Sequence, residues 1–95
     1  MKIYKENTTL HCELSGRFDT NKALAFEAEI NKYLDSDITN IVYDLKNIVF
    51  VSSYFLRVCL NSIKFIGKDN FKIINIHPEV KKVFIISGFD KIIQI

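Results

Sequence analysis

The sequence predicts an α/β fold built on a mixed, mostly parallel sheet. Segments with the apolar patterns of strands alternate with segments that have the periodicity of amphipathic helices. Two strands come first with no helix between them, which predicts an antiparallel hairpin. A helix separates each later strand from the one before it, and such crossovers make neighbouring strands parallel. At 95 residues the chain is expected to form a single domain over residues 1–95.

The hairpin is predicted at residues 3–4 and 9–14, with a turn at residues 6–8. The second strand alternates cleanly, because Leu10, Cys12 and Leu14 point one way and polar residues lie between them. Such a strand has one buried face. The other face is therefore expected to be wet or to lie at an edge.

A first helix is predicted from about residue 20 to about residue 34. Residues 15–20 are expected to break the preceding strand, and either Asp19 or Thr20 has a side chain suited to cap a helix. The apolar residues of the segment fall on one helical stripe: Ala23, Phe26, Ile30 and Leu34. We expect this stripe to face the core.

Residues 41–45 form a short, nearly all-apolar strand, and the lack of alternation predicts that both faces are covered or that the strand lies centrally beside parallel neighbours. The apolar run at residues 48–51 then ends at Ser52 and Ser53, and a helical pattern continues to residue 68. A buried strand thus leads through two hydroxyls into a helix start, where N–H groups are free. A serine there can cap the helix, and a phosphate can also be accommodated.

The helix after Ser53 has three kinds of surface. Its main apolar arc holds Phe55, Leu56, Cys59, Leu60, Ile63 and Ile66. The opposite, polar arc holds Arg57, Asn61, Lys64 and Lys68. A second, narrower apolar strip holds Tyr54, Val58 and Phe65. This strip can pack on a neighbouring helix or be presented to a partner, and the cationic arc can be a solvated face or meet an acidic partner.

The chain is expected to end with a strand at residues 71–76 and a helix that Pro78 opens and Gly88 terminates. The inward positions of that helix are predicted to be Val80, Val83, Phe84 and Ser87. Residues 90–95 fit either a terminal strand or a docked tail.

Composition excludes several classes of function. The net charge of +2 comes from 13 basic and 11 acidic residues scattered along the chain, which argues against nucleic-acid binding. Cys12 and Cys59 fall on the apolar faces of their segments, which predicts buried, reduced thiols in a cytosolic protein. No signal peptide is recognised, and no apolar run approaches the ~20 residues of a membrane span.

The residues that several classes of enzyme require are also missing. Neither of the two glycine-rich phosphate-binding loops occurs. His11 and His77 are not spaced for a metal with a cysteine or carboxylate partner. We therefore expect no enzyme, no catalytic residue, no metal and no cofactor.

Four segments resemble, in order, the sequence motifs of one family. Residues 16–21 are similar to its Gly-Arg-Phe-Asp-Thr segment, and Asp44-Leu45 to the pair that closes its central strand. Residues 50–58 resemble its strand-to-helix signature, and residues 80–89 its ending, which closes on Ser-Gly. These are the marks of STAS domains, specifically of anti-sigma factor antagonists.

The resemblance implies a four- or five-stranded mixed sheet with three to four helices largely on one face. It also implies a bacterial cytoplasmic protein, a monomer or weak dimer, whose partner is an anti-sigma factor with serine kinase activity. Binding releases the sigma factor, phosphorylation at the start of the second helix abolishes binding, and a phosphatase reverses it. By position that serine is Ser53, with Ser52 as second candidate. The expected partner-binding residues are Asp19, Thr20, Ser52, Ser53, Tyr54, Arg57, Asn61 and Lys64.

Tyr54 and Phe55 replace the small residue and the glycine that follow the family's serine. Glycine permits close approach of a partner backbone, which a bulky pair would alter or block. This favours an alternative, a STAS scaffold without phosphorylation in a transporter-associated or signalling complex. Ser53 can also be a plain helix cap. A third candidate function, a module that binds a small molecule or nucleotide, is supported only by analogy with other proteins of this fold.

Overall fold

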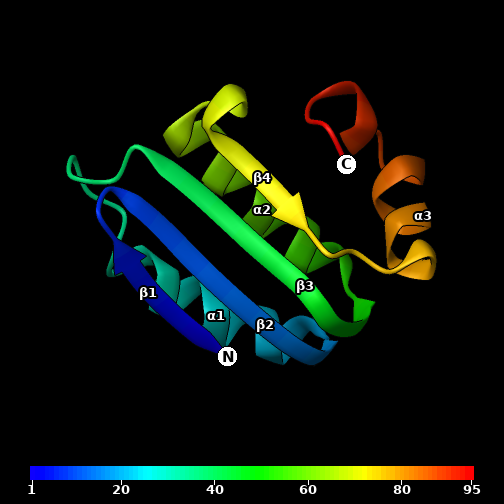
Figure 1. The fold of residues 1–95 in the computed structure, drawn as a ribbon. Coiled ribbons are helices and arrows are strands. Elements are labelled where there is room, and N and C mark those ends of the chain that lie inside the picture. Colours follow the sequence, from blue (N-terminus) through cyan, green and yellow to red (C-terminus); the bar gives the residue numbers. More distant parts are fainter.

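The computed structural model describes all residues, 1–95, as one four-stranded sheet with three α-helices and two 3-10 turns. The strands lie in the order β1-β2-β3-β4; β1 is antiparallel to β2, and the other neighbours are parallel (Figure 1). The α/β fold with an N-terminal hairpin is therefore confirmed. In chain order the elements are β1 (Lys2–Glu6), β2 (Thr9–Phe18), α1 (Thr20–Asn31), β3 (Asn40–Val51), α2 (Ser53–Ile66), β4 (Phe71–Ile74) and α3 (Pro78–Ile86).

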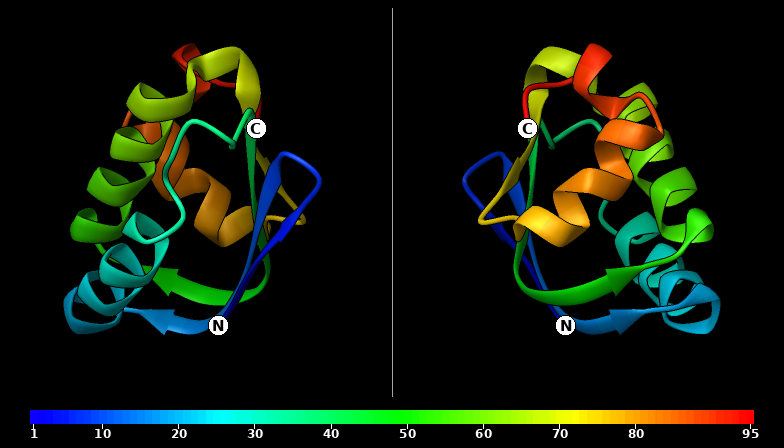
Figure 2. Two further views of the ribbon diagram at one scale, coloured as in Figure 1. Left: turned by 90° about the vertical axis from the view of Figure 1, so that its left-hand side faces the viewer. Right: turned by 90° about the vertical axis from the view of Figure 1, so that its right-hand side faces the viewer.

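The helices cover one face of the sheet and leave the other without a helix (Figure 2). Leu10, Cys12 and Leu14 of β2 are buried beneath the helices, as their alternation predicts. Of the two alternatives predicted for residues 41–45, the structure confirms the central position. These residues lie centrally between parallel neighbours, yet Val42 and Asp44 remain partly exposed on the open face.

The strand β2 is longer than expected, because residues 15–18 continue it instead of breaking it. Gly16 has a φ of 87°, a conformation that favours glycine, and the pairing with β3 shifts on both sides of it. A glycine in a strand often marks such an irregularity. The segment read as a break is thus an irregular stretch of strand.

The two apolar segments at residues 41–45 and 48–51 are one strand, β3. Between the pairs Glu13–Asp44 and Ser15–Asn47, and again between Gly16–Ile48 and Arg17–Phe50, β3 uses one residue more than β2. Each extra residue is a bulge that shifts which side chains point inward. Ile48 and Val51 are therefore buried, but Val49 is 66% exposed. The expectation that the whole apolar segment 48–51 is buried is thus wrong.

Several element ends differ from the predicted ones. The helix α1 ends at Asn31 and leaves Leu34 half-buried beyond it, while α2 ends at Ile66 because Gly67 takes a φ of 91°. In α3, Val80 and Phe84 point inward as expected, but Val83 and Ser87 are exposed. Gly88 adopts the predicted left-handed conformation.

After Gly88 the chain forms a 3-10 turn and a tail, with Phe89 and Ile93 buried and no fifth strand. Cys12 and Cys59 are buried free thiols, as predicted. No helix has the length and apolarity needed to span a membrane.

Candidate partner-binding site

The carboxyl ends of β2 and β3 lie side by side at one edge of the sheet (Figure 1). Phe18 pairs with Val51, and the Ser52 backbone N–H donates to the Phe18 carbonyl at 2.9 Å. Each strand leads directly into a helix. The starts of α1 and α2 are therefore neighbours, and residues 19–20 and 52–54 meet there although they are far apart in the sequence.

At the start of α1, Asp19 is the capping residue. Its Oδ1 accepts a hydrogen bond from the Lys22 backbone N–H at 2.9 Å. Thr20, the other candidate, is the first helical residue and is exposed. An acceptor at this position satisfies one of the free N–H groups and favours negative charge near the positive helix end. Both side chains are accessible at the edge of the sheet.

At the start of α2, the two serines occupy different environments. Ser52 is the cap, and its half-buried Oγ accepts a hydrogen bond from the Phe55 backbone N–H at 3.2 Å. Ser53 is the first residue of the helix, and it is exposed. The capping role that remained open for Ser53 thus belongs to Ser52. The Ser53 hydroxyl makes no protein hydrogen bond, and it is accessible to another molecule.

Phe55 does not contribute to the surface of this site. Its side chain is fully buried, and its ring centroid lies 5.1 Å from that of Phe18, 6.1 Å from Tyr43 and 6.5 Å from Phe84. The volume of the ring fills the centre of the core between sheet and helices. The bulk of Phe55 therefore leaves the approach to Ser53 unobstructed.

Tyr54 lies half-buried between the first two helices. Its hydroxyl donates to Glu27 Oε1 on α1 at 2.6 Å. This hydrogen bond to a carboxylate raises the pKa of Tyr54, and desolvation adds to the rise. Of the strip formed by Tyr54, Val58 and Phe65, only Phe65 is exposed. The start of the strip therefore packs on the neighbouring helix, one of the two options that the pattern left open.

The polar arc of α2 is exposed along its length at Arg57, Asn61 and Lys64. The helix contains no acidic residue, and none of the four ion pairs of the protein involves it. Arg57 and Lys64 are thus free cations on one face. This face begins one helical turn beyond Ser53, so the arc continues the surface that starts at the sheet edge.

One pair of residues at this edge, Arg17 and Phe50, carries no signal in the sequence. The Arg17 guanidinium lies 4.4 Å from the ring centroid of Phe50, within the range of a cation–π contact. Both side chains are exposed on the open face of the sheet, next to the strand ends. Only the bulged register brings Arg17 opposite Phe50, and no local sequence pattern reports that register.

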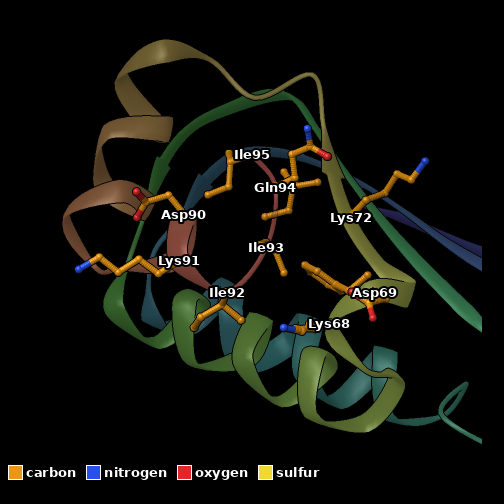
Figure 3. A pocket seen from close by; sticks show the side chains of 11 residues that line it. Lys68, Asp69, Lys72, Asp90, Lys91, Ile92, Ile93, Gln94 and Ile95 are labelled. Carbon is orange, nitrogen blue, oxygen red and sulfur yellow. The ribbon is translucent and has the colours of Figure 1, made fainter.

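The largest cavity lies elsewhere. It has a volume of about 730 Å³ and lies between β4 and the C-terminal tail (Figure 3). Its charged lining residues have both signs: Lys68, Asp69, Lys72, Asp90 and Lys91. It contains none of the predicted site residues.

Comparison with known proteins gives a family and a fold. The STAS domain family model matches residues 1–95. A comparison with curated proteins finds no match.

Three solved structures share the fold, and 98% of this chain aligns with each. The unphosphorylated anti-sigma factor antagonist SpoIIAA is 21% identical, with a TM-score of 0.81 and 84% of its chain covered. The Bacillus cell fate determinant SpoIIAA in its phosphorylated form is 20% identical, with a TM-score of 0.74 and 87% of its chain covered. An anti-sigma factor antagonist from Mycobacterium paratuberculosis is 21% identical, with a TM-score of 0.84 and 80% of its chain covered.

Proposed function

The chain belongs to the STAS domain family, and we propose that it acts as an anti-sigma factor antagonist. It binds an anti-sigma factor with serine kinase activity, which releases the sigma factor in the bacterial cytoplasm. Phosphorylation of Ser53 switches the binding off, and a phosphatase restores it. One of the related structures is an anti-sigma factor antagonist in its unphosphorylated form, and another is SpoIIAA in a phosphorylated form.

The observation that carries this proposal is the exposure of Ser53 at the start of α2. The neighbouring Ser52 supplies the cap, so the Ser53 hydroxyl is not needed to hold the helix. A kinase can therefore modify Ser53 without dismantling the helix end. Ser52, the second candidate, is half-buried and hydrogen-bonded, which makes it the poorer acceptor of a phosphate.

The switch acts on the complex and leaves the domain folded. A phosphate adds about 1.5–2 negative charges and three acceptor oxygens. At the first residue of a helix the macrodipole stabilises such a charge by about 0.3–1 kcal/mol. Against an apolar or acidic partner surface, the same phosphate loses its hydration and costs several kcal/mol. The modified protein is thus intact but unable to bind.

The partner surface is proposed to span the edge where β2 and β3 end and to continue along the polar arc of α2. The first helix contributes Asp19 and Thr20, which lie beside the start of α2. The second contributes Ser52, Ser53, Tyr54, Arg57, Asn61 and Lys64. All of these are exposed or half-buried, so each can contact a docked protein.

Tyr54 and Phe55, which stand in place of the motif's small residue and glycine, are the reason to consider the alternative, a scaffold that is never phosphorylated. Phe55 lies inside the core, so it cannot hinder a kinase. Tyr54 stays at the surface and is held by its hydrogen bond to Glu27. A Tyr54→Ala variant separates the two cases, because a kinase that is merely hindered by the ring should phosphorylate that variant faster than the wild type.

The direct test is phosphorylation by the proposed partner, an anti-sigma factor kinase of the same organism. The protein is incubated with that kinase and ATP, its intact mass is measured, and the modified peptide is sequenced. We expect one phosphate, on Ser53, and none in a Ser53→Ala variant that melts like the wild type. A mass that stays unchanged for the wild type and for Tyr54→Ala would favour the scaffold instead.

A further inference from the structure

One face of α2 carries positive charge that nothing in the protein neutralises. Arg57, Asn61 and Lys64 follow one another at spacings of four and three residues, so they form one exposed stripe. The helix has no acidic residue. Acidic side chains of α1 are engaged elsewhere, since Glu27 accepts the Tyr54 hydroxyl and Glu29 pairs with Lys32.

Arg57 is placed to reach Ser53. The two residues are four positions apart on α2, so their side chains lie on the same side of the helix one turn from each other. Helical side chains lean toward the N-terminus, which directs Arg57 back over the first turn. The Arg57 charge also opposes the rise in the pKa of Tyr54, the residue next to Ser53. Arg57 makes no ion pair there.

We propose that Arg57 serves two competing contacts: an acidic surface of the partner in the unphosphorylated protein, and the phosphate of Ser53 in the phosphorylated one. The proposal rests on the proposed function. Lys64 extends the contact with the partner along the stripe. Phosphorylation then weakens binding not only by repelling the partner's carboxylates but also by capturing the cation that attracted them.

The chemistry of the two contacts favours this competition. Guanidinium binds carboxylate and phosphate with the same paired N–H geometry, so one group excludes the other. A phosphate on Ser53 is covalently held one turn away, whereas a partner carboxylate must be brought there by association. Two acidic groups lie on the neighbouring side, Asp19 at the start of α1, which accepts the Lys22 N–H, and Glu27 of α1, which accepts the Tyr54 hydroxyl. Neither forms an ion pair with Arg57.

The intramolecular contact can be measured without any partner. Phosphoserine is incorporated at position 53 during translation, and ³¹P NMR follows the second ionisation of the phosphate with pH. Because Arg57 favours the dianion, Arg57→Gln should raise that pKa by about 0.2–0.4 units. The matched control is Lys64→Gln, which removes the same charge from the same stripe. Lys64 lies ~16 Å along the axis from Ser53, beyond the Debye length at physiological salt, so its removal should shift the pKa by under about 0.1 units.

Equal shifts in the two variants, or no shift in Arg57→Gln, would overturn the contact between Arg57 and the phosphate. Both variants alter exposed side chains and should melt like the wild type, which far-UV circular dichroism checks.

The competition with a partner is measured with the proposed anti-sigma factor kinase as probe, in the presence of ADP so that no phosphate is transferred. Arg57→Gln and Lys64→Gln should each weaken binding of the unphosphorylated protein about three- to tenfold and reduce its salt dependence. Phosphoserine at position 53 should lower the affinity in both the wild type and Arg57→Gln, but by a factor at least about three times smaller in Arg57→Gln. In Lys64→Gln, phosphoserine should lower the affinity by the same factor as in the wild type. Additive effects of phosphate and Arg57→Gln would refute the competition.

The binding measurement and the ³¹P titration test the two contacts of Arg57 separately. If the kinase binds neither the wild type nor any variant, the proposed function and the acidic-partner contact both fall. The ³¹P titration still decides whether Arg57 holds the phosphate.

Discussion

The division of labour between Ser52 and Ser53 gives the sharpest prediction for stability. Ser52 caps α2 through the 3.2 Å hydrogen bond from the Phe55 N–H, whereas Ser53 Oγ makes none. Removing a capping hydroxyl typically costs about 1 kcal/mol. For a domain of this size, 1 kcal/mol corresponds to about 4–8 °C in Tm, so Ser52→Ala should melt about 4–8 °C lower than the wild type.

Ser53→Ala should change the free energy of unfolding by less than about 0.5 kcal/mol, as for ordinary surface sites. Ser53→Asp should be equally stable or slightly more stable, because a carboxylate in the first turn interacts favourably with the helix dipole. Thermal melts followed by circular dichroism, together with urea titrations, measure all three variants. A Ser53→Ala variant as destabilised as Ser52→Ala, or an unfolded Ser53→Asp, would show that Ser53 is structural and refute the reasoning.

Three further predictions concern the core. Phe55→Gly, which introduces the glycine of the motif that residues 50–58 resemble, should lower the free energy of unfolding by about 3–5 kcal/mol, because the ring is fully buried among other rings. A loss below about 1 kcal/mol in a urea titration would contradict its place in the core. The Tyr43 hydroxyl and Ser62 Oγ form a buried hydrogen bond of 2.6 Å. Tyr43→Phe should lower the free energy of unfolding by about 1–3 kcal/mol, because it leaves Ser62 Oγ buried without a partner. Adding Ser62→Ala should recover most of that loss, and a purely additive double variant would argue against the bond. Burial raises the pKa of Cys12 from 9.0 to about 12, so the thiol ionises only in the unfolded chain over that interval. The contribution of the buried Cys12 thiol to stability is full below pH 9 and falls as the pH rises toward 12, by up to about 1.4 kcal/mol per pH unit. Above pH 9 the free energy of unfolding of Cys12→Ala should therefore decline less steeply with pH than that of the wild type.

The sequence predicts the order and type of the elements because the hydrophobic periodicities are clear and the helix start signals are strong. Asp19 before α1 and Pro78 at the start of α3 are local signals, and the structure has both helices beginning there. What the sequence could not supply was register. The bulges in β3 depend on pairing with β2, so the exposure of Val49 and the contact of Arg17 with Phe50 follow from tertiary structure alone.

At the candidate site, too, the sequence predicts the location but not the role of each side chain. The pattern places two serines at a helix start, but only the backbone geometry decides that Ser52 is the cap and Ser53 the first helical residue. Likewise, the helical wheel puts Phe55 at the margin of the apolar arc, whereas the rings of Phe18 and Phe26 around it show that it is central to the core. Local sequence thus identifies the site, and packing decides what each side chain contributes to it.

The most direct test of the switch at Ser53 is a comparison of affinities by isothermal titration calorimetry. The proposed partner, an anti-sigma factor kinase, is held in ADP and titrated with the protein carrying either serine or phosphoserine at position 53. We predict tight binding of the serine form and at least about a hundredfold weaker binding of the phosphoserine form, equivalent to about 2.7 kcal/mol. Equal affinities for two forms that are both folded would contradict the account.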